Sequence, residues 1–113
     1  MNNLPPKLRK ELAADPEYQR CLRNDILRDH TCQPDPMTGK LIEWEHAMYF
    51  KGKQLQEAWA IVPICYWAHR GEGFDKEINQ FLALNRASNE ELAAISKATD
   101  YIRERRRLTD KYL

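Results

Sequence analysis

Only two segments of this chain have the pattern of a β-strand, and both are short. Residues 41–46 partly alternate between polar and apolar side chains after a turn, and residues 60–65 form a second apolar run. Pro63 has no N–H to donate to a ladder, so the second strand must be short or lie at an edge. A chain of 113 residues fits one domain. We therefore expect an α+β fold, with a small β element supported by helices.

The segment that precedes the strands has the pattern of two short helices. Two prolines near its start suit a first helical turn, and good helix formers follow them. Asp15-Pro16 is expected to end the first helix and to cap the second, which should end near Leu27. The prolines and the glycine of residues 29–40 predict a loop. This helical extension covers residues 5–27.

A second helical extension is expected over residues 75–110. Apolar side chains recur at helical spacing from Asp75 to about Arg86, which predicts a helix with one buried face. Ser88 and Glu91 then have the spacing of a capping box. The apolar residues beyond this box predict one further helix, which runs from Ser88 toward Leu108.

Charge, apolar runs and cysteines exclude several classes of protein. Lys and Arg number 18 against 17 Asp and Glu, so any nucleic-acid contact must depend on local positive charge. No apolar stretch approaches the roughly 20 residues that span a bilayer, and the polar first ten residues lack the apolar region of a signal peptide. Three cysteines, an odd number, favour reduced thiols or metal ligands over a disulfide framework. We expect a cytoplasmic protein without a membrane partner.

Potential ligands and bases concentrate around the two strands, and they are Glu43, Glu45, His46, Cys65, His69 and Glu72. Adjacent strand residues point to opposite faces, so Glu45 could reach a metal ion while His46 reaches a water molecule. Glu43 lies on the same face as Glu45 and could replace it. A metal-assisted phosphodiester hydrolase needs a cation that stabilises negative charge and a neutral imidazole that takes a proton from water. Two histidines and a carboxylate supply that set.

Two sequence segments resemble the motif of the HNH, or ββα-metal, nucleases, and they are Ile42-Glu-Trp-Glu-His46 and Trp59-Ala-Ile-Val-Pro-Ile-Cys65-Tyr-Trp-Ala-His-Arg-Gly71. In that family an acid-His or His-His pair ends one strand, a second strand follows, and a helix carries a final His or Asn. The resemblance implies a ββα-metal core over residues 41–72, flanked by the two helical extensions. It says little about the extensions themselves.

The resemblance also implies roles for particular residues. His46 falls on the general base, and Glu45 and His69 fall on the ligands of one divalent cation. Mg²⁺ or Mn²⁺ is expected there, with Ni²⁺ or Zn²⁺ as alternatives. The implied activity is hydrolysis of DNA phosphodiesters with little sequence specificity. By analogy with small phage HNH proteins, the implied role is phage DNA recombination or processing.

The chain departs from the family at the residue that orients the base. Ala60 stands where the family usually has an asparagine. Gln54, Gln56 or a backbone carbonyl could take its place, since an imidazole needs only one acceptor on its other nitrogen to fix its tautomer.

The second departure concerns structural zinc. Many relatives carry two Cys-x-x-Cys pairs, whereas this chain has only Cys32 and Cys65 near the expected places, with Ala68 where another thiol would lie. Cys21 and His30 could complete a degenerate site. Small buried hydrophobic side chains are the default interpretation of the three cysteines, so zinc is not part of the predicted site.

Positive side chains near the motif are candidates for contact with DNA phosphates. We expect Arg70 first, and then Lys53 and Lys51, while a denser run near the end has the pattern of a solvated helix face and comprises Arg103, Arg105, Arg106 and Arg107. The aromatic residues near the motif are expected in the core, and they are Trp44, Trp59, Tyr66 and Trp67.

Two other functions remain open. The chain could be a nucleic-acid-binding module that lost catalysis together with the asparagine at position 60. Alternatively, it could be a structural zinc protein that mediates protein contacts, in which case metal bound by the cysteines would be needed for folding.

Overall fold

The computed structural model describes residues 4–95 and 98–113 and has a mixed α+β architecture, as expected from the sequence. Its elements in chain order are α1 (Pro6–Ala13), α2 (Leu22–Leu27), β1 (Ile42–His46), β2 (Tyr49–Phe50), β3 (Lys53–Gln54), the 3₁₀ turn η1 (Ala58–Ala60), β4 (Ile61–Cys65), α3 (Tyr66–His69), α4 (Lys76–Arg86), α5 (Asn89–Ala93) and α6 (Ala98–Tyr112).

The two predicted strands pair with each other. β1 and β4 form an antiparallel two-stranded sheet, in which Ile42 lies opposite Cys65 and His46 lies opposite Ile61. Pro63 lies opposite Trp44. Both strands of this sheet are edge strands within the described residues, which is where a residue without an N–H is tolerated. A small β2–β3 hairpin, which the sequence analysis did not predict, lies in the connection between β1 and β4.

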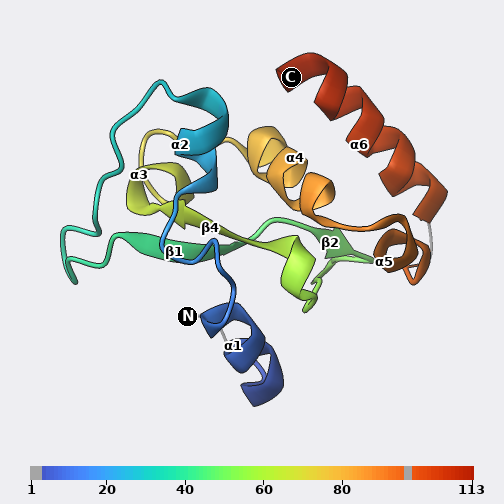
Figure 1. Cartoon of the computed structure of the whole chain (residues 1–113), viewed down its shortest axis with the longest axis horizontal. Helices are drawn as coiled ribbons and strands as arrows, with labels where there is room; N and C mark the ends of the chain where they lie inside the picture. Colours follow the sequence, from blue (N-terminus) through green and yellow to red (C-terminus); the bar gives the residue numbers. More distant parts are fainter. Residues whose placement is uncertain (1–3, 96–97) are drawn as a thin grey trace.

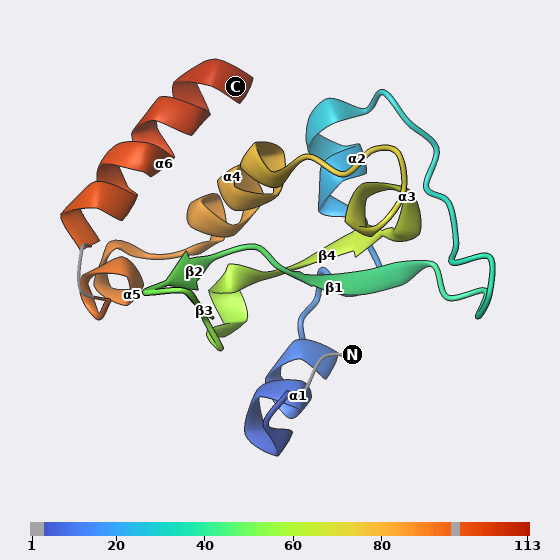
Figure 2. The same ribbon diagram turned by 180° about the vertical axis from the view of Figure 1, so that it is seen from behind.

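The sheet lies between two groups of helices (Figures 1 and 2). α1 lies on one side, where Leu8 and Leu12 are buried against Ile61. α2, α3 and α4 lie on the other side. α4 supplies much of the main core through Phe81, which is fully buried, and through its neighbours on the same helix face. The sheet is therefore covered on both faces, which explains why all five residues of β4 are buried.

The turn from α3 to α4 is built around Trp67. A side chain at Gly73 would meet the Trp67 ring, because an ideal Cβ there would lie 2.3 Å from it. Asp75 then caps α4 by accepting hydrogen bonds from the backbone N–H groups of Glu77 and Ile78. These contacts set the position of α3, whose last residue is His69.

The predicted helices are confirmed in most of their extent, with two corrections. The first helix and the Asp75–Arg86 helix form as α1 and α4. Asp15-Pro16 ends α1 but does not cap the next helix: residues 15–20 form turns, and α2 starts at Leu22. This happens because the Tyr18 N–H bonds to the Asp15 carbonyl in a tight turn instead of continuing as a helix.

The second correction concerns the helix expected from Ser88 to Leu108. The capping box of Ser88 and Glu91 is present, but α5 ends at Ala93 and α6 is a separate helix. The Ala94 and Ile95 N–H groups close the end of α5 with bonds to preceding carbonyls. α6 then packs against α4 and α5 and buries Leu108 completely. The apolar positions of one expected face therefore belong to two helices.

The aromatic side chains near the motif divide into two groups. Trp59 is buried, as expected, whereas Trp44, Tyr66 and Trp67 are only half-buried. Within the described part of the chain, no helix combines the length and the apolar composition that crossing a bilayer requires.

Candidate functional site

A pocket of about 400 Å³ opens at the end of β1, and we call it the β1 pocket. It lies where the end of β1 meets α3 and the first half of α4. All three residues predicted as base and metal ligands are among those that line it, which are Glu45, His46, Ala47, Tyr49, His69, Phe74, Lys76 and Asn79. The fold thus brings together residues that lie 24 positions apart in the sequence, from Glu45 to His69.

Two carboxylates of β1 hold the imidazole of His69 between them. Glu43 and Glu45 lie on the same face of the strand, because they are two residues apart. The Nδ1 atom of His69 lies 2.5 Å from Glu43 Oε1, and its Nε2 atom lies 3.6 Å from Glu45 Oε1. A carboxylate behind one nitrogen is the usual way in which a metal-binding histidine is oriented. Glu43 therefore leaves the other nitrogen of His69 facing Glu45.

Arg70 fixes Glu43 from its other side. Its Nε lies 3.1 Å from Glu43 Oε1, and its second terminal nitrogen contacts both Glu43 and Asp35. Hydrogen bonds to Glu43 and Asp35 raise the pKa of Arg70 above its ordinary value. In the free protein this guanidinium neutralises two carboxylates, and its contact with a DNA phosphate stays a prediction.

Glu45 has a second partner, which sequence reasoning missed. Its Oε2 atom lies 3.5 Å from Asn79 Nδ2, and the Asn79 side-chain oxygen accepts a hydrogen bond from Arg23 at 3.2 Å. Burial raises the pKa of Glu45, while the charge of His69 and the Asn79 hydrogen bond oppose that shift. The sequence signal that could have identified Asn79 is a polar residue next to Ile78 on the buried face of α4.

His46 is the most enclosed of the three predicted residues. Its side chain is 4% exposed, and its Nε2 atom has no hydrogen-bond partner among the described residues. Burial lowers the pKa of His46, and a side-chain hydrogen bond with Gln56 partly offsets this. Gln56 was one of the three alternatives for the missing asparagine. Ala60 itself is fully buried, and its carbonyl accepts a hydrogen bond from the Ala47 N–H.

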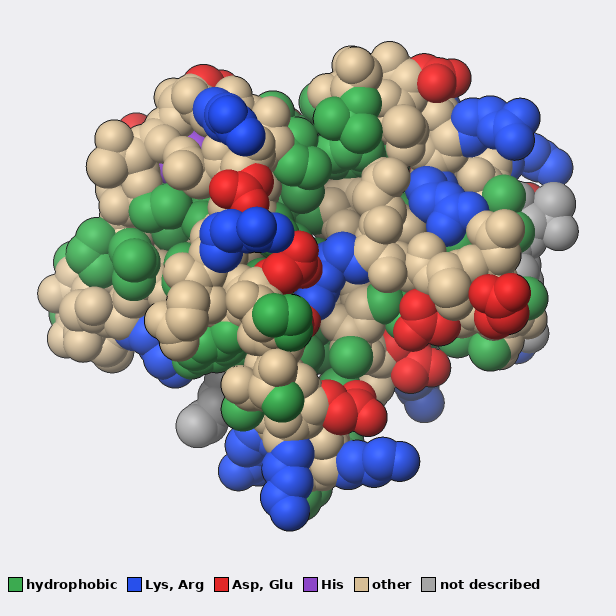
Figure 3. Space-filling model, viewed as in Figure 1, with side chains coloured by type: hydrophobic (Ala, Val, Ile, Leu, Met, Phe, Trp, Pro, Cys, Tyr) green, Lys and Arg blue, Asp and Glu red, His purple; other side chains and the backbone are tan. Residues whose placement is uncertain are grey.

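The lysines that could contact DNA phosphates lie in two places, on the β2–β3 hairpin and at the β1 pocket. Lys51 and Lys53 are exposed on the β2–β3 hairpin, whose turn uses positive φ angles at Lys51 and Gly52. Lys76, which sequence reasoning missed, lines the β1 pocket, with its Nζ atom 5.9 Å from the Tyr49 ring centroid. Positive and negative side chains are interspersed on the face seen in Figure 3.

The arginine run of α6 is largely committed to contacts within the protein. Arg105 donates to the Ala87 carbonyl and contacts Asn89, and Arg107 pairs with Glu77 and with a glutamate of its own helix. Such pairs are typical of a solvated helix face, as expected from the sequence.

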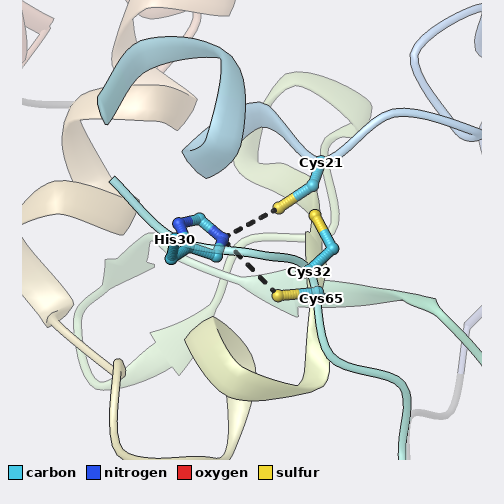
Figure 4. A group of neighbouring side chains, drawn as sticks. All are labelled: Cys21, His30, Cys32 and Cys65. Carbon is cyan, nitrogen blue, oxygen red and sulfur yellow. Dashed lines mark hydrogen bonds between the residues drawn. The ribbon is translucent and has the colours of Figure 1, made fainter. Parts of the chain in front are cut away.

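A second group of potential ligands lies outside the β1 pocket, and we call it the Cys/His group: Cys21, His30, Cys32 and Cys65 (Figure 4). Their ligand atoms all lie within 4.8 Å of one another, so the group could hold a metal ion. The His30 Nε2 atom lies 3.9 Å from Cys21 Sγ and 3.8 Å from Cys65 Sγ. Burial raises the pKa of Cys21, and burial with the neighbouring thiols raises that of Cys32 to about 12.

Sequence analysis named all four residues but could not predict that they lie close together. The spacing from Cys21 to Cys65 matches no regular zinc motif, and the cysteines were therefore expected to be ordinary buried side chains. The pairing of β1 with β4 and the loop of residues 28–41 bring them together. Cys65 caps α3 at its start and His69 ends it, so the Cys/His group and the β1 pocket lie at opposite ends of one helical turn.

Comparison of the chain with protein-family models, with curated proteins and with solved structures found no match.

Proposed function

We propose that the β1 pocket is the active site of a metal-dependent nuclease that hydrolyses DNA phosphodiester bonds. The observation that carries the proposal is the meeting of Glu45, His46 and His69 in one pocket, with Glu43 behind the imidazole of His69. A carboxylate, an oriented imidazole and a second imidazole with an unpartnered nitrogen are the groups that this chemistry requires.

Glu45 and His69 would hold the metal ion. Their facing atoms lie 3.6 Å apart, which is near the separation expected for two ligands of one ion. Mg²⁺ or Mn²⁺ is the first choice, with Ni²⁺ or Zn²⁺ as alternatives, because the donors are one oxygen and one nitrogen. When bound, the ion would stabilise negative charge on the phosphate and on the departing oxygen.

His46 would act as the general base. Its buried environment favours the neutral imidazole, which can accept the proton of the attacking water. The water oxygen forms a bond to phosphorus, the bond from phosphorus to the leaving oxygen breaks, and that oxygen takes up a proton from solvent. Gln56 would hold the imidazole in one orientation.

Local cations would position the DNA. Lys76 lines the pocket, and Lys51 and Lys53 are exposed nearby on the β2–β3 hairpin, which begins at the pocket residue Tyr49. Contacts from lysine to phosphate carry no base information, which agrees with low sequence specificity. A role in phage DNA recombination or processing rests on the family resemblance alone.

The test is cleavage of supercoiled and branched DNA by the purified protein, in EDTA and then with Mg²⁺, Mn²⁺, Ni²⁺ or Zn²⁺. We expect metal-dependent nicking that falls about 10²- to 10⁴-fold in His46→Ala, the usual contribution of a general base. Glu45→Gln and His69→Ala should also lose cleavage. Glu72→Gln is the matched control, because Glu72 is exposed and does not line the pocket.

Two results would contradict the proposal. Undiminished cleavage by folded His46→Ala protein would show that another group activates water. A folded wild-type protein that binds DNA but cleaves none with any of the four ions would instead indicate the binding module that the loss of the asparagine at position 60 suggests.

A further inference from the structure

We propose that the Cys/His group binds one structural Zn²⁺ ion, separate from the metal at Glu45 and His69, and that the buried guanidinium of Arg23 balances the charge of this site. The inference goes beyond the proposed nuclease activity and does not depend on it. It rests on the arrangement of Cys21, His30, Cys32 and Cys65 shown in Figure 4.

The geometry of the Cys/His group fits a tetrahedral zinc centre. Zinc bonds of about 2.3 Å to sulfur and about 2.0 Å to nitrogen place tetrahedral S and N ligands about 3.6 Å apart. The His30 Nε2 atom lies 3.8 Å from Cys65 Sγ and 3.9 Å from Cys21 Sγ, close to that separation. Cys32 completes the set within the same 4.8 Å limit. Little movement would be needed to bring all four atoms onto one ion.

The other nitrogen of His30 also has the surroundings of a zinc ligand. Its Nδ1 atom is buried, has no hydrogen bond, and lies 3.7 Å from a carboxylate oxygen of Asp29. Histidines that bind zinc usually direct their second nitrogen toward a carboxylate or carbonyl group. The ring stacks on Trp67 with centroids 4.3 Å apart, which fixes its plane.

A disulfide would explain the group less well. One bond between two of the three cysteines would leave the third thiol and His30 without a partner in a largely buried cluster. One zinc ion satisfies all four side chains at once. Four protein ligands also close the coordination sphere, which is the mark of a structural rather than a catalytic zinc site.

Arg23 supplies an independent observation. Its side chain is 3% exposed, and among the described residues no carboxylate forms an ion pair with it. Burial lowers the pKa of Arg23, and the charges of Asp75 and Asp29 oppose that shift from a longer distance. The polar partner of Arg23 is the neutral Asn79, its Nε atom has none, and its guanidinium lies 5.5 Å from the Trp67 ring centroid. A buried cation without a directly paired counter-charge is costly.

Zinc binding would explain why the charged side chain of Arg23 is buried at this place. Two positive charges from zinc and three negative charges from thiolates leave the site with one net negative charge, since the imidazole is neutral. Arg23 is two residues from Cys21, at the start of α2, and contacts Trp67, which packs on His30. The occupied site therefore adds a net negative charge beside this guanidinium, to which the described residues supply no directly paired carboxylate.

The first test is the metal content of the wild-type protein, measured by mass spectrometry after dialysis against EDTA. We expect one zinc per chain, which is released when a thiol-modifying reagent is added. Metal-free protein refilled with Co²⁺ should show sulfur-to-cobalt charge-transfer absorption and the visible bands of a tetrahedral site. Protein that retains no zinc and gives no such cobalt spectrum would overturn the proposal, as would a disulfide found by mass spectrometry.

Variants separate this site from the β1 pocket. His30→Ala should lose zinc, and His30→Cys should retain it, because a fourth thiolate is also a zinc ligand. His69→Ala is the matched control, since it removes a histidine from the β1 pocket and should keep one zinc per chain. Loss of zinc in His69→Ala would contradict the separation of the two sites. A zinc-loaded protein that cleaves no DNA would contradict only the nuclease proposal.

The role of Arg23 has its own readout, which is the zinc affinity measured by competition with a chromogenic chelator. Arg23→Met should weaken zinc binding by about 10- to 100-fold, as losses of supporting residues around metal sites usually do, while the stoichiometry stays at one. The control is Arg28→Met, because Arg28 is exposed one residue beyond the same helix. Equal zinc affinity in Arg23→Met and wild-type protein would show that Arg23 does not balance the site.

Discussion

The β1 pocket and the Cys/His group lie at the two ends of α3, and they differ in ligand chemistry and in access. The pocket offers Glu45 and His69 beside half-exposed Tyr49 and Phe74, so a bound ion would keep open positions for water and phosphate. The Cys/His group offers four ligands, mostly buried, and leaves no position open. If both proposals hold, one helical turn joins an exchangeable metal site to a structural one.

The largest expected effect is the loss of the proposed structural zinc. Structural zinc in small sites contributes roughly 10–16 kcal/mol of binding free energy, which becomes folding free energy. We expect zinc-free protein, prepared with a thiol-modifying reagent, to lose its cooperative thermal transition by circular dichroism. Dialysis against EDTA alone should abolish cleavage and leave that transition intact. If the thermal transition of zinc-free protein is unchanged, zinc does not stabilise the fold, and the two sites do not differ in the way proposed.

The next effect tests the orientation of His69. Glu43→Gln removes the carboxylate that holds Nδ1 at 2.5 Å, and we expect it to weaken the activating metal by about 10- to 100-fold. The measurement is cleavage against metal concentration, and activity should recover near saturating metal because His46 is unaffected. Glu72→Gln should follow the wild-type curve. Equal metal dependence in Glu43→Gln would show that Glu43 does not position His69.

A smaller effect tests whether the turn from α3 to α4 is coupled to the Cys/His group through Trp67. In Gly73→Ala the new Cβ would lie 2.3 Å from the Trp67 ring, which must then move. Overpacking of this kind costs about 1–3 kcal/mol of unfolding free energy. Since Trp67 stacks on His30, zinc affinity should fall as well. Denaturant unfolding and chelator competition measure the two effects, and a fall in stability without any change in zinc affinity would contradict the coupling.

The smallest effect lies away from both sites and depends on pH. Hydrogen bonds from Lys111, Tyr112 and Arg107 lower the pKa of Glu77 to about 2. An unfolded glutamate titrates near 4.3, so this carboxylate stabilises the folded protein above that pH and loses its effect as pH falls toward 2. Glu77→Gln should therefore be less stable than wild type at neutral pH, with the difference vanishing in acid.

The matched control for Glu77 is Glu90→Gln, because Glu90 is exposed on α5. Zinc content and cleavage should stay at wild-type values in both variants. A stability difference between Glu77→Gln and wild type that persists unchanged down to pH 2 would contradict the pKa shift.

Local patterns predicted much of the fold because they act over a few residues. Helical spacing located α4, and the capping box of Ser88 located the start of α5. The end of α5 was missed, because Leu92 and Ile95 continue a helical pattern that the turn at Ala94 interrupts. α6 packs against α4 and α5, and such contacts between distant residues are not visible in a local pattern.

Some residues of the candidate site were predicted from the sequence, and others were missed. Glu45, His46 and His69 were found because they lie within a short stretch around two strands. Asn79 and Lys76 were missed, because α4 reaches the pocket only through the turn at Gly73. Of the three alternatives offered for the missing asparagine, Gln56 is the one that raises the pKa of His46 against the effect of burial, and its orienting role stays a prediction.

By itself, the sequence determined where the main helices begin and the two strands of the β1–β4 sheet, since propensity, capping and periodicity are properties of neighbouring residues. Only the tertiary structure decided that Cys21, His30, Cys32 and Cys65 form one group, and that Glu43 holds the imidazole of His69. The physical reason is that a ligand set depends on distances of a few ångström between side chains far apart in the chain. Those distances are fixed by the β1–β4 pairing and by the packing of α3, and no local pattern encodes them.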